Sequence, residues 1–333
     1  MYRFDYKAYR RPFAKAFANA RESFATREGL LVRMEDRDGR VGFGEAAPIP
    51  SFGSESFVSA LAAAQALGER VSVEQLQSRE LAGCPCLRWA LESAIDFLKR
   101  EGDRPKLEKP WPVCGLMSDL EANEALEQRL AMHYRCLKFK IGKGSFLEER
   151  RALERVIDLA GESVQLRLDA NASLTLSQAR AWMEAVSELP VEFLEQPLPK
   201  GQEKEMRRLA GDFPTAIALD ESVCSVDDLK RWRDEQWPGV FVVKASLSGG
   251  FEDLRQELGQ GDCDCVFSSA LETMVGAGAA IDFAIRNASQ RRALGFGVEK
   301  LFADRNVGLA LGPFLQNGDL PGIDSLERLW NQI

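Results

Sequence analysis

Three carboxylates at the ends of short apolar runs are the residues best suited to chemistry in this 333-residue sequence. Asp169, Glu195 and Asp220 are 26 and 25 residues apart, close to the length of one strand followed by one helix. Neighbouring strands lie about 4.8 Å apart, so three such side chains can converge on one cation. An all-oxygen cluster with three negative charges suits a hard ion such as Mg²⁺. The spacing therefore predicts a divalent metal site.

Two lysines end similar runs on either side of these carboxylates. Lys140 precedes Asp169 by 29 residues, and Lys244 follows Asp220 by 24. In a barrel of eight strands the two lysines would be four strands apart, so they would face each other across the mouth. One could act as a general base and the other as a stabilising cation. Lys138 points to the same side of its strand as Lys140, and its like charge is expected to disfavour the ammonium form of Lys140.

Five further polar residues lie near these positions. Arg167 shares a strand face with Asp169, so it is either an ion-pair partner inside the barrel or a substrate contact. Asn171 and Glu221 follow the carboxylates and are expected to orient the metal ligands or the lysines. Ser268 and Ser269 end a further strand ahead of a helical segment, where their hydroxyl and N–H groups could bind a substrate anion.

The elements that must position these side chains alternate along the chain. Short apolar runs are predicted to be strands at 113–117, 137–142, 164–171, 192–197, 216–222, 239–246 and 265–269, with an eighth around 293–298. Helix starts between them have capping-box spacing at Ser118, Ser145 and Ser225. Serial strand–helix units of this length favour a closed barrel, with the polar residues at its carboxyl end, over an open doubly wound sheet. The open sheet is the alternative.

Residues 1–104 differ in pattern from the rest. Alternating residues on both sides of Asp38-Gly39 predict a hairpin, and apolar spacing predicts helices over 59–67 and 89–98. A polar link containing prolines follows. We therefore expect an α+β capping domain over 1–104 and a barrel over 105–333, with the C-terminal tail as a candidate to pack on the cap.

The loop after the hairpin is rich in glycine, proline and serine. It is expected to act as an active-site lid with Phe52 at its apolar tip. The preceding stretch, Gly42 to Ala47, matches a dinucleotide-binding pattern. Pro48 and Pro50 follow where that pattern requires a helix to begin, so we reject a dinucleotide site.

Composition excludes several classes of protein. The 51 acidic and 43 basic residues leave a charge of −8, which argues against nucleic-acid binding. The seven cysteines contain no CxxC pair, which favours a reduced, cytoplasmic location. No apolar run is long enough to predict a membrane span or signal peptide. A small-molecule partner is expected, and the sequence does not specify whether the protein is a monomer or a homo-oligomer.

Together these residues resemble the enolase superfamily in its muconate-lactonising subgroup. The resemblance rests on the Lys138-x-Lys140 pair, Asp169 in LDAN, Glu195 in EQP, Asp220 in DES and Lys244 in VVKAS. It implies a modified TIM-type (β/α)7β barrel with an N-terminal α+β capping domain. Within the subgroup, GFGEAAPIPSFGSES and SSALET are similar to the members that form 2-succinylbenzoate in menaquinone and phylloquinone biosynthesis.

That resemblance implies a lyase that removes water from 2-succinyl-6-hydroxy-2,4-cyclohexadiene-1-carboxylate. Lys140 would remove the proton next to the carboxylate and return it to the departing hydroxide, and Lys244 would stabilise the enediolate from the opposite face. Asp169, Glu195 and Asp220 would hold Mg²⁺, with Mn²⁺ as a possible substitute. Lys138, Arg167, Ser268, Ser269 and Phe52 would contact the substrate, and Asn171 and Glu221 would support the ligands.

Other activities stay open. N-acylamino acid racemases of the same superfamily need the same two lysines. Dipeptide epimerases carry an Asp-x-Asp at the last strand, where this sequence has GFGVEK. A Schiff-base aldolase using Lys140 or Lys244 is an alternative from a different class. The single histidine, His133, is poorly placed for a Ser-His-Asp mechanism.

Overall fold

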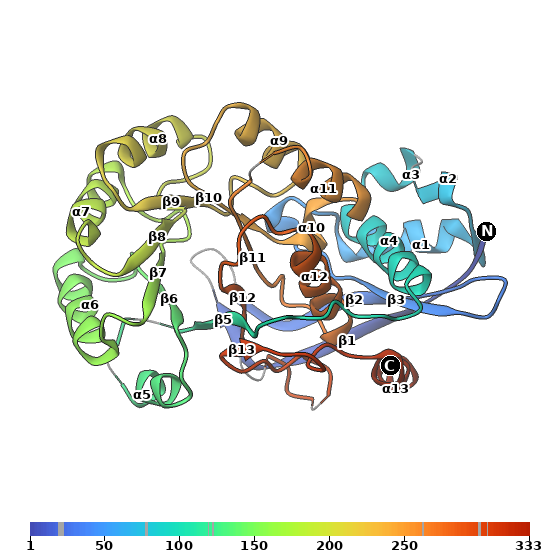
Figure 1. Cartoon of the computed structure of the whole chain (residues 1–333). Helices are drawn as coiled ribbons and strands as arrows, with labels where there is room; N and C mark the ends of the chain where they lie inside the picture. The colour runs from blue at the N-terminus through green and yellow to red at the C-terminus, as the bar shows by residue number, and fades with distance from the viewer. Residues whose placement is uncertain are drawn as a thin grey trace.

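The computed structural model describes residues 1–18, 23–76, 79–118, 120–121, 123–261, 263–298, 301–304 and 306–333. The chain forms an antiparallel sheet with helices at the N-terminal side and a parallel barrel with surrounding helices beside it (Figure 1). No helix in the described part of the chain is long and apolar enough to cross a membrane.

The N-terminal sheet has the strand order β3-β2-β1-β4. Its members are β1 (Tyr2–Ala18), β2 (Ser23–Glu35), β3 (Val41–Ala46) and β4 (Arg70–Val71). The predicted hairpin is confirmed: Glu35 pairs with Val41, and Gly39 adopts the left-handed φ of 79° that favours glycine in the connecting turn. Strand β1 was not predicted, although Tyr2, Phe4 and Tyr6 alternate with charged residues at its start.

Four helices belong to this part of the chain: α1 (Phe57–Leu67), α2 (Val73–Leu76), α3 (Arg79–Ala82) and α4 (Pro85–Lys99). The long helix α4 packs directly on β3. A Cβ on Gly42 or Gly44 would come within 1.9 Å of a carbonyl oxygen of α4, at Ala94 or Ala90. The glycine pattern therefore serves close packing of helix on strand, which explains why it resembles a dinucleotide motif without being one.

Eight parallel strands form the barrel, in the order β11-β10-β9-β8-β7-β6-β5-β12. They are β5 (Trp111–Leu116), β6 (Cys136–Lys140), β7 (Gln165–Asp169), β8 (Val191–Glu195), β9 (Ala216–Leu219), β10 (Val240–Val243), β11 (Cys265–Phe267) and β12 (Leu294–Gly297). A parallel bridge between Ser268 and Gly295 joins β11 to β12 and closes the ring. The predicted strands and their order are confirmed, and the open-sheet alternative is wrong.

Helices follow the first seven barrel strands and cover their outer face (Figure 1). They are α5 (Glu124–Ala131), α6 (Phe146–Ala160), α7 (Leu176–Val186), α8 (Glu203–Asp212), α9 (Val226–Asp234), α10 (Ala245–Ser248), α11 (Phe251–Leu258) and α12 (Met274–Asn287). Ser145 and Ser225 cap α6 and α9 as predicted. The prediction at Ser118 is wrong, because Asn123 caps α5 instead.

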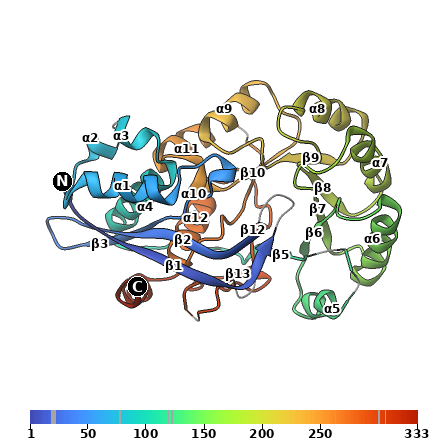
Figure 2. The same ribbon diagram turned by 180° about the vertical axis from the view of Figure 1, so that it is seen from behind.

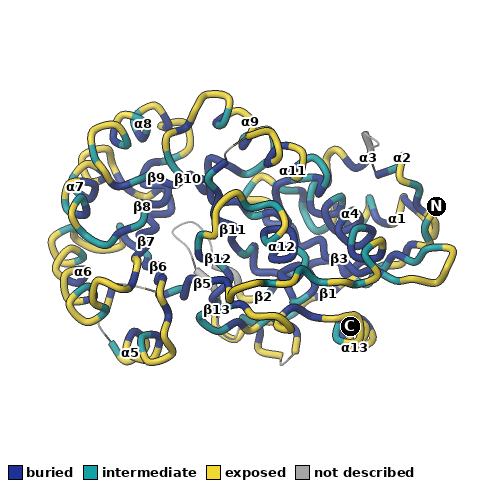
Figure 3. The backbone as a smooth tube through the Cα atoms, viewed as in Figure 1, coloured by how far each residue is buried: buried dark blue, intermediate teal, exposed yellow. Residues whose placement is uncertain are grey.

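The two parts of the chain share a core. Phe13 of β1 forms an antiparallel bridge with Phe302, which follows the last barrel strand in the chain. Strand β13 (Phe314–Leu315) pairs with β5. Helix α13 (Ile323–Gln332) packs Trp330 against Phe43 of β3, with ring centroids 5.9 Å apart. Seen from behind, α13 lies below the N-terminal sheet (Figure 2). Figure 3 shows the barrel strands and β3 as largely buried.

Candidate active site

The barrel strands place five predicted site residues at one edge. Lys140, Asp169 and Glu195 are the last residues of β6, β7 and β8. In the sheet register Lys140 lies opposite Asp169, and Asp169 lies opposite Glu195. Asp220 and Lys244 follow β9 and β10 by one residue. All five line one pocket, together with Lys138, Arg167, Asn171, Ser268, Ser269 and Phe52. Of the predicted site residues, only Glu221 is outside this lining.

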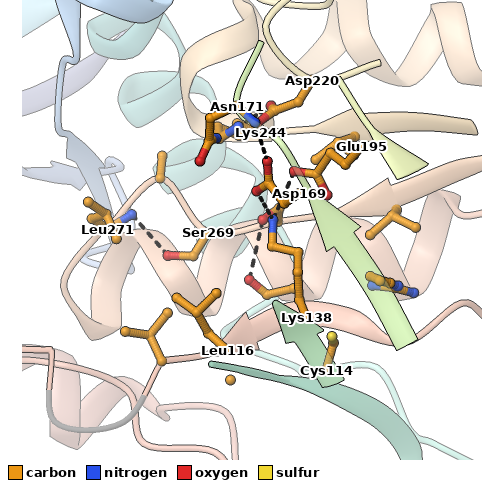
Figure 4. Close-up of a pocket in the computed structure, with 18 of the residues that line it drawn as sticks. Cys114, Leu116, Lys138, Asp169, Asn171, Glu195, Asp220, Lys244, Ser269 and Leu271 are labelled. Atoms are coloured by element: carbon orange, nitrogen blue, oxygen red, sulfur yellow. Dashed lines mark hydrogen bonds and ion pairs between the residues drawn. The ribbon is translucent and has the colours of Figure 1, made fainter. Parts of the chain in front are cut away.

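The three carboxylates are almost fully buried: Asp169 and Glu195 are each 1% exposed, and Asp220 is 4% exposed. Figure 4 shows Asp169, Glu195 and Lys138 pointing toward one another from neighbouring strands. Lys138 donates to Glu195 Oε1 at 2.8 Å and contacts Asp169 Oδ2 at 3.0 Å. Within the described residues, no three Asp, Glu, His or Cys side chains are gathered closely enough to hold a metal ion. Lysine ammonium groups lie against the carboxylate oxygens instead.

Lys140 contacts the same carboxylate as Lys138. Its Nζ donates to Asp169 Oδ2 at 2.6 Å and to Asn171 Oδ1 at 2.7 Å. The sequence-based prediction considered only the repulsion between the two lysines. The shared Asp169 oxygen opposes that repulsion by attracting both ammonium groups.

Lys244 lies four strands away from Lys140 in the sheet order. It donates to Asp220 Oδ1, and its Nζ is 4.3 Å from the centroid of the Phe52 ring. Burial lowers the pKa of Lys244, but Asp220 and Glu221 outweigh this effect, so its pKa lies above the ordinary value. Lys244 is therefore held as a cation beneath an aromatic ring, which is a favourable contact.

The charges inside the pocket perturb two carboxyl groups in opposite directions. Burial raises the pKa of Asp169, but Lys138 and Lys140 outweigh it and hold this pKa well below its usual range. Burial and the charges of Asp169 and Asp220 raise the pKa of Glu195 to about 8. Glu195 thus lies close to two other buried carboxylates. The three carboxylates supply the oxygen ligands that a hard divalent cation prefers, and a cation bound there would replace the lysine contacts on those oxygens.

Of the two residues expected to support the carboxylates, Asn171 contacts Asp169, and Glu221 contacts Asn171. The backbone N–H of Asn171 donates to Asp169 Oδ1 at 2.9 Å, and its side-chain Nδ2 donates to Glu221 Oε1 at 3.3 Å. Glu221 is buried, and its second oxygen has no hydrogen-bond partner among the described residues. Burial and the neighbouring Asp220 raise the pKa of Glu221 to about 7.

Sequence reasoning missed Gln196, which is fully buried beside Glu195. Its Oε1 accepts from the backbone N–H of Asp220 at 2.9 Å and of Ser222 at 3.2 Å. Gln196 therefore fixes the turn that carries Asp220. Gln196 has a left-handed φ of 36°, which is unusual for a residue other than glycine. The sequence alone does not reveal this angle.

Arg167 and the two serines have protein partners. Arg167 is 1% exposed and pairs with Glu192 through a 2.6 Å bond, which fits the ion-pair interpretation of this residue. Ser268 donates to Gly295 O at 3.4 Å, at the bridge that closes the barrel. Ser269 donates to Glu272, another residue that the sequence analysis missed.

The N–H groups at the start of α12 are also occupied. Buried Glu45 of β3 accepts from the N–H groups of Thr273 and Gly276. These helix N–H groups are therefore not free to bind an anion, and the substrate-binding role of Ser268 and Ser269 stays a prediction. His133 is exposed in a turn after α5 and does not line the pocket.

A closed parallel barrel with lysines and carboxylates at its strand ends, next to an antiparallel sheet with helices, is the architecture of the enolase superfamily. The family described as "Enolase C-terminal domain-like" matches residues 121–260, and "MenC, N-terminal domain" matches residues 3–97. The chain is 33% identical to an o-succinylbenzoate synthase of Thermosynechococcus vestitus over 99% of both chains. This chain therefore belongs to the o-succinylbenzoate synthase family.

One further comparison agrees with this assignment, and another is to a dipeptide epimerase. The crystal structure of an o-succinylbenzoate synthase from Thermosynechococcus elongatus BP-1, complexed with Mg in its active site, has a TM-score of 0.85. That protein is 32% identical in sequence, and the match covers 99% of this chain and 100% of the other. A hydrophobic dipeptide epimerase from a Flavobacteria bacterium is 27% identical over 86% of this chain and 84% of its own.

Proposed function

We propose that this protein is a Mg²⁺-dependent lyase that dehydrates 2-succinyl-6-hydroxy-2,4-cyclohexadiene-1-carboxylate to 2-succinylbenzoate, as in menaquinone or phylloquinone biosynthesis. The observation that carries the proposal is the pair of lysines on opposite sides of a buried carboxylate cluster. The similarity to o-succinylbenzoate synthases over 99% of the chain supports the choice of substrate.

In this proposal Asp169, Glu195 and Asp220 hold the cation. A divalent cation bound there would supply positive charge next to the substrate carboxylate, where negative charge develops. Mn²⁺ would serve as a substitute ion because it accepts the same oxygen ligands. Asn171 and Glu221 orient these ligands through the hydrogen bonds described above.

Lys140 acts as the base and then as the acid. Its amine removes the proton from the ring carbon that bears the carboxylate, and the electrons of the C–H bond form an enediolate. The C–O bond to the ring hydroxyl then breaks, and Lys140 returns the proton so that water leaves and the ring becomes aromatic. Lys244 stays protonated beneath Phe52 and stabilises the enediolate from the opposite face.

The cap and the remaining polar residues complete the site in this proposal. Residues 1–104 form the capping domain, whose loop carries Phe52 over the pocket, and residues 105–333 form the barrel, with α13 packed on the cap. Lys138, Arg167, Ser268 and Ser269 lie close enough to the pocket to contact substrate. The cytoplasmic location stays a prediction.

The last barrel strand favours dehydration over dipeptide epimerisation. Gly295 and Gly297 of β12 line the pocket where the epimerases carry their Asp-x-Asp. Asp304 contacts Arg11 at 3.7 Å and is not among the residues that line the pocket.

Anaerobic turnover of the cyclohexadiene carboxylate, followed by the absorbance of the aromatic product, tests the proposal. We expect turnover that is lost on chelation and restored by Mg²⁺. An N-succinyl amino acid assayed in parallel tests racemisation, and borohydride tests for a Schiff base. Turnover of only the N-succinyl amino acid, or a trapped lysine adduct, would contradict the dehydration.

The raised pKa of Glu195 predicts that Mg²⁺ affinity depends on pH. Below about pH 8 this carboxyl group holds a proton that a metal ion must displace. The affinity should therefore fall by up to about tenfold for each unit of pH below 8 and level off above it. Calorimetric titration of the protein with Mg²⁺ from pH 6 to 9 measures the effect. In Glu195→Gln the Mg²⁺ affinity should be weak and should depend much less on pH over this range. A Mg²⁺ affinity that stays constant with pH in the unmodified protein would disprove the prediction.

A further inference from the structure

A buried arginine outside the catalytic cluster holds two walls of the pocket together. Arg27 of β2 is 5% exposed. Its guanidinium donates to the carbonyl oxygens of Pro48 at 2.6 Å and of Ala47, which lie in the loop that leads to Phe52. It also donates to the carbonyl oxygens of Ala270 at 3.1 Å and of Leu271 at 3.2 Å, which lie in the loop after β11.

Both loops supply side chains to the pocket. Ile49 and Phe52 come from the first loop, and Ala270 and Leu271 come from the second. Arg27 itself is not a lining residue, so it acts on the pocket only through the backbone of these two loops. Among the described residues, Arg27 forms no ion pair with a carboxylate. Its four hydrogen bonds there all go to backbone carbonyl oxygens.

Neither loop can satisfy these carbonyl groups through regular secondary structure. Strand β3 ends at Ala46, and prolines at 48 and 50 provide no N–H groups. Leu271 has a left-handed φ of 63°, a conformation that costs energy for a leucine and persists only when its surroundings hold it. The backbone N–H of Leu271 donates to Ser269 Oγ at 2.9 Å (Figure 4), and Arg27 donates to the carbonyl oxygen of Leu271.

The loop that carries Phe52 is anchored at two further points. The N–H of Ile49 donates to Ser54 Oγ at 2.7 Å. Buried Glu55 accepts from the N–H groups of Cys86 and Leu87 at the start of α4. These contacts anchor the segment that carries Phe52 on both sides, and its predicted role as a lid stays a prediction.

We propose that Arg27 is a positioning residue that sets the apolar wall of the pocket by binding both loops at once. The inference rests on the proposed function for the identity of the ligand. In this proposal Ile49 and Leu271 contact the apolar part of the substrate, and Phe52 covers Lys244. Because such contacts are made equally in the ground state and the transition state, Arg27 governs substrate affinity more than the rate of the chemical step.

The test compares Arg27→Met with Arg27→Lys and with a matched control. Arg100 also joins the N-terminal part to the barrel, since it binds Asp96 of α4 and Asp282 of α12, but it lies away from this pocket. We expect Arg27→Met to raise KM about tenfold and to weaken binding of 2-succinylbenzoate by a similar factor, with kcat reduced less than about threefold. Arg27→Lys, which keeps the charge and three donors, should recover part of this loss. Arg100→Met should lower the melting temperature and leave KM unchanged.

Hydrogen exchange provides a readout that does not depend on the substrate. Amides of residues 47–56 and 268–272 should exchange faster in Arg27→Met than in Arg100→Met. Unchanged KM and unchanged exchange in Arg27→Met would overturn the inference while leaving the proposed function intact. If the unmodified protein does not turn over the cyclohexadiene carboxylate, the proposed function fails, and the exchange rates still decide whether Arg27 holds the two loops.

Discussion

Replacement of Lys140 by alanine is expected to reduce turnover by roughly three orders of magnitude or more, because general acid–base catalysis contributes about 10²–10⁴ in rate and this side chain acts in both steps. The fold should persist. Asp169 keeps its contact with Lys138 at 3.0 Å, and Asn171 keeps its bond to Glu221. Steady-state kinetics measure the loss, and circular dichroism with thermal unfolding checks the fold.

Lys143 offers a matched control for this variant. It lies three residues further along the chain, in the loop after β6, is exposed, and donates to the Ser118 carbonyl group. Lys143→Ala should leave turnover close to that of the unmodified protein. Added primary amines should restore part of the activity of Lys140→Ala, since a free amine can replace the missing base. Full turnover in Lys140→Ala without an added amine would exclude Lys140 as the base.

Asp220→Asn is expected to weaken Mg²⁺ binding by about 100-fold, which corresponds to about 2.7 kcal/mol. The substitution preserves the shape of the side chain but removes one of the three negative charges that the cation would neutralise. It also removes the charge partner of Lys244. Turnover should therefore fall at low Mg²⁺ and recover in part at high Mg²⁺.

Calorimetry and the Mg²⁺ dependence of turnover measure both effects. Asp212→Asn is a suitable control, because Asp212 is an exposed residue at the end of α8 that pairs with Arg180 at 2.5 Å. It should bind Mg²⁺ like the unmodified protein. An unchanged Mg²⁺ affinity in Asp220→Asn would contradict its assignment as a ligand.

The barrel could be predicted from the sequence because its signal is local and repeated. Each strand is a short apolar run with a polar residue at its end, and the positions from Lys140 to Ser268 recur every 24 to 29 residues. Parallel strands in sequential order then bring their carboxyl ends together, so the gathering of Asp169, Glu195 and Lys140 follows from spacing alone.

The contacts around this centre could not be predicted in the same way. Arg27 binds the carbonyl group of Leu271, 244 residues away, and Glu45 caps α12 from the N-terminal sheet, 228 residues from Thr273. No local pattern encodes such pairings, because each depends on how two separately formed units pack. The sequence analysis also expected the carboxylates to face a cation, and it did not predict that Lys138 would lie between Asp169 and Glu195.

The packing of α13 on the N-terminal sheet also affects the order in which the molecule can be assembled. Tyr9, Phe43 and Trp330 belong to one apolar cluster that also contains Leu271, a residue that lines the pocket. During translation, Trp330 is synthesised 284 residues after Ala46, the last residue of β3. The apolar cluster around Phe43 and Leu271 is therefore completed only after the last helix has been synthesised and has docked.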